Sequence, residues 1–141
     1  MAATRTAKAH WEGTLAEGSG HVTFESSGAG TFDVSWASRV QAPNGQTSPE
    51  ELIAAAHASC FNMSLSHILT GAGTAPQGLD TSAEVTFEVG KGITGIQLTV
   101  RASVEGVSAE DFVAAAEDAK ANCPVSQALT GTTITLDAAL A

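Results

Sequence analysis

Apolar and polar residues alternate over three short stretches in the first third of the chain. The stretches Thr6–Glu12, His21–Ser26 and Thr31–Ala37 are separated by the glycine-rich sequences AEGSG and SGAG. Such a pattern predicts three strands joined by tight turns. The sequence QAPNGQTSP then ends the alternation with two prolines and an Asn-Gly pair. We therefore expect a small β region, then a loop.

A long, alanine-rich apolar run follows this loop. Ser48 is a suitable N-cap, Pro49 suits the first helical position, and Glu51 completes a Ser-x-x-Glu capping box. The helix is expected to end near Thr70, where two glycines follow. This run predicts the main helix of the fold.

The apolar residues of this helix fall on two nearly opposite stripes, since each residue turns by about 100°. Helices apolar on two sides are buried from two directions. We expect one stripe to pack on the chain's own sheet and the other on a second copy, which predicts a homodimer. The first stripe is Leu52, Ile53, Ala56, Cys60, Met63 and His67, and the second is Phe61, Leu65 and Ile68.

The second half of the chain predicts a hairpin, two helical segments and a final strand. The hairpin strands are Asp80–Val89 and Ile93–Val104, joined by a Gly-Lys-Gly turn. Ser108 begins a helix to about Asn122, and Cys123 begins a short helical turn before the last strand, TTITLDAAL. This order of elements predicts an α+β fold in which the helices pack against a sheet.

Length, charge and composition restrict the functions that the chain can have. Its 141 residues fit a single domain, 1–141. A net charge of −9, with only six Lys plus Arg, argues against binding to nucleic acid or to an anionic membrane surface. MAATRTAKAHWEG has no apolar signal region, and polar residues interrupt the long apolar run, so we expect a cytoplasmic protein without a membrane span. Two cysteines in that compartment favour a catalytic or redox role over a structural disulfide.

The two cysteines are the candidate chemistry of this sequence. Cys60 lies in the middle of the long helix, where packing explains it as readily as catalysis, because free cysteine is among the most buried residue types. Cys123 precedes Pro124 at an expected helix N-cap, where backbone N–H groups and the helix dipole favour a thiolate. A buried cysteine that happens to precede a helix-starting proline is the alternative.

Three other side chains are candidates for supporting roles. Arg39 follows the apolar strand TFDVSWAS and is either the partner of a thiolate or a solvated charge at a strand end. Glu50 suits the first helical turn for dipole reasons, and it lies about 15 Å along the axis from Cys60. It can therefore reach Cys60 only across an antiparallel pair of such helices. His57 shares the side of Cys60; a packed or hydrogen-bonded histidine explains it better than a metal site, because no zinc-binding spacing occurs.

PEELIAAAHASCF in the long helix, together with CPVSQAL before ITLD, resembles the OsmC-like family of peroxidases. That family includes the organic hydroperoxide resistance proteins. HWEG and ITLD resemble the OsmC branch, so the resemblance spans nearly the whole chain. In the organic hydroperoxide resistance branch, the catalytic arginine lies in an earlier glycine-rich loop and a Gly-Tyr pair replaces Ala56-His57. Here EGSGH has no arginine, and Arg39 matches the OsmC-branch position.

The resemblance implies an OsmC-like fold with an antiparallel sheet, a long central helix and an intertwined homodimer whose active sites are shared between chains. It implies that Cys60 is the peroxidatic thiolate and that Arg39 lowers its pKa and orients the peroxide. Glu50 would hold Arg39 by a bidentate ion pair. Cys123 would condense with the oxidised Cys60 to form a disulfide.

The resemblance also implies an organic hydroperoxide substrate, a dithiol reductant of the lipoyl type, no cofactor or metal, and a part in oxidative or osmotic stress. Apolar walls from Ile53, Met63 or Phe61 would favour organic peroxides over hydrogen peroxide. Three alternatives stay open: another thiol activity on the same fold, a redox-sensing or ligand-binding dimer, and a structural dimer with inert thiols.

Overall fold

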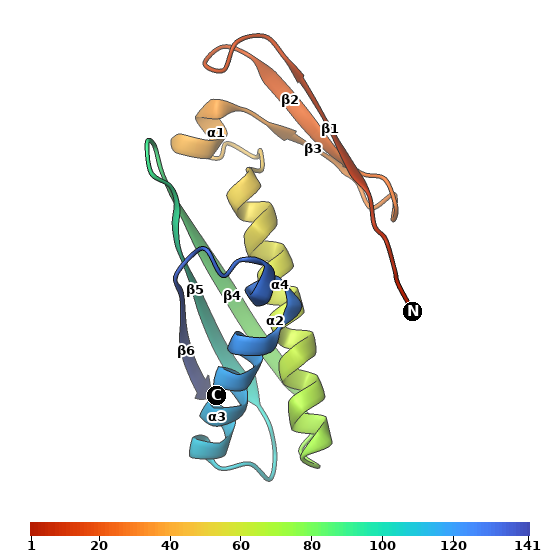
Figure 1. The fold of residues 1–141 in the computed structure, drawn as a ribbon, viewed down its shortest axis with the longest axis vertical. Coiled ribbons are helices and arrows are strands. Elements are labelled where there is room, and N and C mark those ends of the chain that lie inside the picture. The colour runs from red at the N-terminus through yellow and green to blue at the C-terminus, as the bar shows by residue number, and fades with distance from the viewer. The chain divides into compact units, whose positions relative to one another are not determined.

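The computed structural model describes all residues from 1 to 141, and the chain divides into two compact units, Met1–Leu52 and Ile53–Ala141 (Figure 1). Both units combine helix with sheet, so the predicted α+β class is confirmed. The predicted single sheet is in fact two sheets of three strands each. The single domain expected over the whole chain stays a prediction.

The first unit holds an antiparallel sheet in the order β1-β2-β3, followed by a short helix. Its glycine-rich turns fall where the sequence predicts them, and the first two strands begin and end within two residues of the expected bounds. The elements are β1 (Ala7–Glu12), β2 (Ser19–Phe24), β3 (Thr31–Val34) and α1 (Trp36–Val40).

The short helix α1 corrects the prediction of a strand up to Ala37. The strand stops early because Ser35 caps α1, and its Oγ accepts from the Ser38 backbone N–H at 3.1 Å. The Ser38 Oγ accepts in return from the Ser35 N–H at 3.0 Å. This reciprocal pair is a capping box, and it outweighs the strand-like alternation of TFDVSWAS. Arg39 therefore lies in the last turn of a helix and not at the end of a strand.

Helix α2 (Pro49–Gly71) confirms the predicted long helix. The Ser48 Oγ accepts from the Glu51 N–H at 3.1 Å, as the predicted cap requires. The second half of the box is different, because the Glu51 carboxylate accepts from the Thr47 hydroxyl at 2.6 Å instead. At the other end, Gly73 has a φ of 85°, a left-handed conformation that glycine adopts without strain and that ends the helix.

The second unit packs helices on a mixed sheet. β4 and β5 form the predicted antiparallel hairpin, but β6 runs parallel to β5, which corrects the expected all-antiparallel sheet. The reason is the helical connection between β5 and β6, since a crossover returns the chain to the same end of the sheet. The elements are β4 (Gly78–Glu88), β5 (Gly92–Ser103), α3 (Ala109–Asn122), α4 (Pro124–Ala128) and β6 (Ile134–Leu140).

One face of α2 supplies the core of this second unit. The fully buried side chains from α2 are four residues apart, as one helix face requires, and they include His57. The predicted alternation of β5 is confirmed, because every second side chain from Ile96 to Ala102 is buried. The core cluster is Phe61, Leu65, Leu69, Leu98, Val100, Ala102, Phe112, Ala116 and Ala119.

The other predicted stripe of α2 is uncovered in a single chain. Met63 is 73% exposed and Cys60 is only partly buried. By length and hydropathy alone α2 would also pass as a membrane span, which is weak evidence because core helices of soluble proteins pass the same test. The homodimer that would cover this stripe stays a prediction.

Candidate active site

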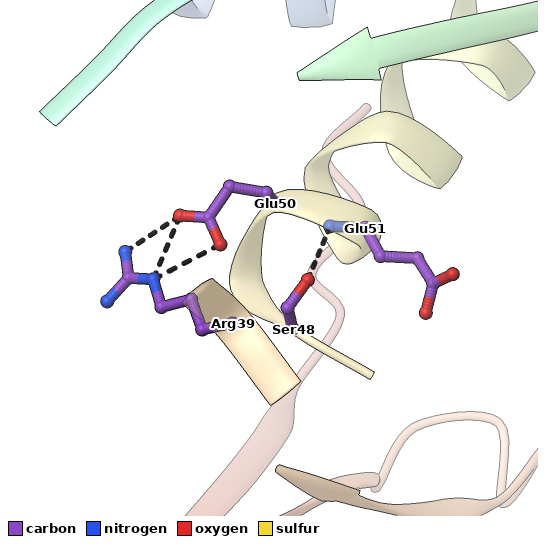
Figure 2. A network of polar contacts seen from close by, with 4 residues as sticks. All are labelled: Arg39, Ser48, Glu50 and Glu51. Atoms are coloured by element: carbon purple, nitrogen blue, oxygen red, sulfur yellow. Dashed lines mark hydrogen bonds and ion pairs between the residues drawn. The ribbon is translucent and has the colours of Figure 1, made fainter. Parts of the chain in front are cut away.

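Arg39 and Glu50 form a bidentate ion pair at the start of α2 (Figure 2). The Arg39 Nε lies 3.0 and 3.1 Å from the two Glu50 carboxylate oxygens, and Nη2 lies 2.8 Å from Oε1. The Glu50 side chain is only 9% exposed and that of Arg39 is 30% exposed, so the carboxylate of this charge-assisted pair is largely shielded from bulk water. The ion pair expected between these two residues is therefore present.

Local backbone structure orients the Arg39 and Glu50 side chains toward each other. The capping box of α1 fixes the turn that carries Arg39, and the Ser38 Oγ also donates to the Thr47 carbonyl at 3.1 Å. That contact ties α1 to the residues just before α2. Figure 2 shows Glu50 turned toward Arg39 while Glu51 points away. The first glutamate of PEEL is thus the one that holds the arginine.

An apolar cavity of about 350 Å³ adjoins this arginine. The Trp36 ring lies 6.0 Å from the Arg39 guanidinium carbon. The residues that line this cavity could not be identified from the sequence, because they come from three separate segments that only the fold brings together. Phe61, which was expected to line a peroxide pocket, is instead fully buried in the core. The cavity is lined by Trp11, Leu15, Val34, Ser35, Trp36, Arg39 and Pro49.

The two cysteines are neighbours in the second unit, where Cys60 lies on α2 and Cys123 at the N-cap of α4. Both are free thiols; Cys123 is fully buried and Cys60 partly so. Burial raises the pKa of the Cys60 thiol, a hydrogen bond with the Val125 backbone lowers it, and the hydrogen-bonded Cys123 thiol beside it raises it again. The net effect raises the pKa, so these surroundings alone favour the neutral thiol of Cys60.

Cys123 occupies the N-cap of α4, as the sequence predicts. Its Sγ accepts a hydrogen bond from the Ser126 backbone N–H at 3.4 Å. The Ser126 hydroxyl also contacts this sulfur at 3.3 Å. These two contacts hold the sulfur at the start of α4.

His57 is a buried, hydrogen-bonded histidine, which confirms that expectation. Its Nε2 lies 2.7 Å from the Ser126 Oγ, and its ring is fully buried. Burial lowers the pKa of His57, so the ring is neutral at pH 7. The sequence analysis missed Ser126, whose only signal is its place three residues after the N-cap. No group of three or more His, Cys, Asp or Glu side chains is placed to hold a metal ion.

The lowered pKa of His57 predicts that acid destabilises the fold. The unfolded chain binds a proton at His57 near pH 6.5, whereas the folded chain binds it only at lower pH. The contribution of His57 to stability is therefore complete above about pH 6.5 and is lost as the pH falls toward the lowered pKa. Urea unfolding at several pH values between 7.5 and 5 should show a shallower loss of unfolding free energy in His57→Gln than in the wild type. The control is His21→Gln, at an exposed position; equal pH dependence in wild type and His57→Gln would contradict this assignment.

Comparison with known proteins gives a consistent result. The profile of the family described as OsmC-like protein matches residues 42–137. A protein named Peroxiredoxin OsmC from Escherichia coli (strain K12) is 41% identical over 140 residues, which cover 97% of this chain and 96% of the relative. The match includes both cysteine-bearing segments.

Solved structures agree with the fold. An organic hydroperoxide resistance protein OsmC from Legionella pneumophila is 26% identical with a TM-score of 0.72, and the match covers 95% of each chain. The organic hydroperoxide resistance protein OhrB of Bacillus subtilis is 26% identical with a TM-score of 0.68, covering 96% of this chain and 98% of that one.

Proposed function

The chain belongs to the OsmC-like family and is a peroxidase, and from this premise we propose that it reduces organic hydroperoxides to alcohols with Cys60 as the peroxidatic thiol. The observation that carries the proposal is that both free thiols lie in the second unit, with Cys123 near enough to Cys60 to act on its pKa. Two neighbouring free thiols are candidates for a disulfide. The names of the two related structures, which refer to organic hydroperoxide resistance, support this substrate class.

The proposed cycle has three steps. The Cys60 thiolate attacks the distal oxygen of the peroxide, the O–O bond breaks, and the alkoxide leaves as the alcohol after taking a proton. Cys60 is then a sulfenic acid. The Cys123 sulfur attacks the Cys60 sulfur and expels the hydroxyl group as water, which leaves a disulfide. An external dithiol, of the lipoyl type that the family resemblance implies, reduces this disulfide by exchange.

Cys60 needs a cation to react as a thiolate. Of the groups that act on its pKa, burial and Cys123 raise it and only the Val125 backbone lowers it, and none of them is positively charged. A buried thiol without a positive partner stays protonated and unreactive. Arg39 is the proposed partner. Its ion pair with Glu50 holds the guanidinium in one orientation, so less entropy is lost when it binds the peroxide.

We place this arginine in the site of a second chain. Within α2, ten residues separate Glu50 from Cys60, which is about 15 Å along the helix axis. Glu50 therefore cannot itself contact the Cys60 of its own helix. An antiparallel pair of α2 helices would place the start of one beside the middle of the other. The stripe of α2 that carries Cys60 and the 73% exposed Met63 is the proposed contact between the two chains.

The cavity beside Arg39 predicts a preference for organic peroxides. Its aromatic and aliphatic walls would bury the hydrocarbon part of cumene hydroperoxide, whereas hydrogen peroxide has no such part. With a dithiol supplied as reductant, the protein should consume many equivalents of peroxide, with kcat/KM higher for cumene hydroperoxide than for hydrogen peroxide. Trp36→Ala should lower this ratio by about tenfold.

The matched control for Trp36→Ala is Phe32→Ala, which removes a partly exposed ring of the same unit that does not line the cavity. That variant should keep the wild-type ratio. Equal wild-type rates with the two peroxides would contradict the proposed substrate class. Consumption of a single equivalent would instead indicate a redox sensor.

A further inference from the structure

We propose that His57, acting through the Ser126 hydroxyl, takes the proton from the Cys123 thiol when the disulfide closes. This inference rests on the proposed function, because it assigns a positioning pair to the second step of that cycle. The side chains involved are buried, and they belong neither to the Arg39–Glu50 ion pair nor to the lining of the peroxide cavity.

Three buried polar side chains contact one another in series: His57 on α2, Ser126 on α4, and Cys123 at the N-cap of α4. We call this series the relay. The His57 Nε2 lies 2.7 Å from the Ser126 Oγ, which lies 3.3 Å from the Cys123 Sγ. All three residues are nearly inaccessible to water: Ser126 is 3% exposed and the other two are fully buried. Water therefore has little access to the Cys123 proton, and the serine hydroxyl is the neighbour that can accept it.

The Ser126 hydroxyl can pass a proton because it is both a donor and an acceptor. In the resting state, the Cys123 thiol donates to the Ser126 oxygen, and the Ser126 hydroxyl donates to the His57 Nε2. When both protons move one step along this chain, Cys123 becomes a thiolate and His57 an imidazolium. The Ser126 backbone N–H, 3.4 Å from the sulfur, then stabilises the thiolate. Both arrangements keep every contact of the chain.

The step balances without any added reactant. The Cys123 thiolate attacks the sulfur of the Cys60 sulfenic acid, the S–S bond forms, and the S–O bond breaks. The departing hydroxide takes the proton that His57 holds, passed back through the Ser126 hydroxyl, so water leaves and His57 is neutral again. Two thiol electrons of Cys123 reduce the Cys60 sulfur, and the product is the disulfide.

The surroundings of His57 suit a transient base. The ring is buried in the core face of α2. The titratable groups next to these three side chains are the two thiols. No carboxylate or cation forms a hydrogen bond or ion pair with the ring. Its Nδ1 is buried without a hydrogen-bond partner. A buried imidazolium without a counterion is unstable. His57 therefore accepts the proton only while the thiolate exists and then gives it up.

A thiol probe distinguishes a proton relay from a purely structural hydrogen-bond network of the same three side chains. The reduced protein is mixed with 4,4′-dithiodipyridine, which releases one thiopyridone when Cys60 forms a mixed disulfide with the probe. Attack by Cys123 then releases the second thiopyridone and closes the Cys60–Cys123 disulfide. The first phase does not need the Cys123 proton to leave, whereas the second phase does. This assay uses no peroxide, so it tests the relay even if the proposed peroxidase cycle fails.

We expect the second phase to slow by at least about tenfold in His57→Gln and in Ser126→Ala, since general bases contribute factors of this size or larger. The first phase should change by less than about twofold. Ser126→Thr keeps a hydroxyl and should restore a fast second phase, which loss of packing alone would not do. The control His21→Gln, at an exposed histidine, should behave like the wild type. A wild-type second phase in His57→Gln, in folded protein, would overturn the proposal.

The same variants mixed with one equivalent of cumene hydroperoxide link the relay to catalysis. Here His57→Gln should form the Cys60 sulfenic acid at the wild-type rate and accumulate it before the disulfide closes. If the wild type forms no sulfenic acid, the proposed function is refuted, but the result with 4,4′-dithiodipyridine still tests the relay. A slow second phase that Ser126→Thr does not restore would indicate a purely structural network and would overturn the relay.

Discussion

Arg39→Met should lower kcat/KM for cumene hydroperoxide by about 100-fold or more, because the guanidinium is the proposed source of both thiolate stabilisation and peroxide orientation. The substitution keeps much of the side-chain volume and removes the charge. It also leaves Glu50 as a carboxylate with only 9% of its side chain exposed and without its arginine partner. Steady-state rates at several peroxide concentrations, with excess dithiol, measure this loss.

Arg101 provides a matched control for the loss of Arg39, because it is another arginine of the same chain that forms an ion pair. Arg101 pairs with Asp137 through contacts of 3.2 Å, but both side chains are about half exposed, and surface pairs of this kind contribute little. Arg101→Met should therefore keep the wild-type rate. Arg39→Lys should fall between wild type and Arg39→Met, since lysine keeps the charge but cannot form the bidentate pair.

The reason for the loss can be measured separately from the rate. In a Cys123→Ser background, the pH dependence of Cys60 alkylation reports its thiolate fraction. Burial raises the pKa of Cys60, and the proposed role of Arg39 is to lower it; the pKa should therefore be higher in the Arg39→Met variant than with Arg39 present, and alkylation at neutral pH should slow. An Arg39→Met variant that keeps both its rate and its alkylation profile would remove Arg39 from the site.

Two inactive variants should restore activity when their chains are mixed. Cys60→Ser keeps Arg39, and Arg39→Met keeps Cys60. If each site takes its cysteine from one chain and its arginine from the other, a mixed dimer contains one complete site. Random reassembly should then give about a quarter of the wild-type specific activity, because half of the dimers are mixed and each of these has one site of two.

The control for this mixture places both substitutions in one chain. Cys60→Ser mixed with the double variant Cys60→Ser/Arg39→Met contains no Cys60 in either chain and should stay inactive. Mixing requires unfolding and refolding the chains together, and gel filtration gives the size of the product. Active wild-type protein that elutes as a monomer, or a mixed dimer without activity, would contradict the shared site.

Local signals explain why so much of the fold could be predicted. Ser48 and Ser108 each cap the helix that follows them, and β5 alternates as a strand with one buried face should. Helix α1 was missed because a serine three residues after a serine is a weaker signal than the apolar alternation around it. The parallel pairing of β6 depends on the crossover of α3 and α4, and no local pattern encodes it.

In the candidate site too, some residues could be predicted from the sequence and others could not. The cysteines were visible because thiols are rare in the chain, whereas the Arg39–Glu50 pair was expected only from the family resemblance. The cavity beside Arg39 could not be predicted, since its walls come from separate segments. Ser126 has no distinctive neighbours in sequence, and only the packing of α4 against α2 brings it to His57.

The count of free thiols after one equivalent of cumene hydroperoxide tests the central claim most directly. The experiment compares the fully reduced wild type with Cys123→Ser. We predict that the wild type loses both thiols to an intramolecular disulfide, whereas Cys123→Ser stops at a sulfenic acid on Cys60 that a dimedone-type reagent traps. If both thiols stay free for several minutes in the wild type, Cys60 is not the peroxidatic residue, and the contact between the two cysteines is packing.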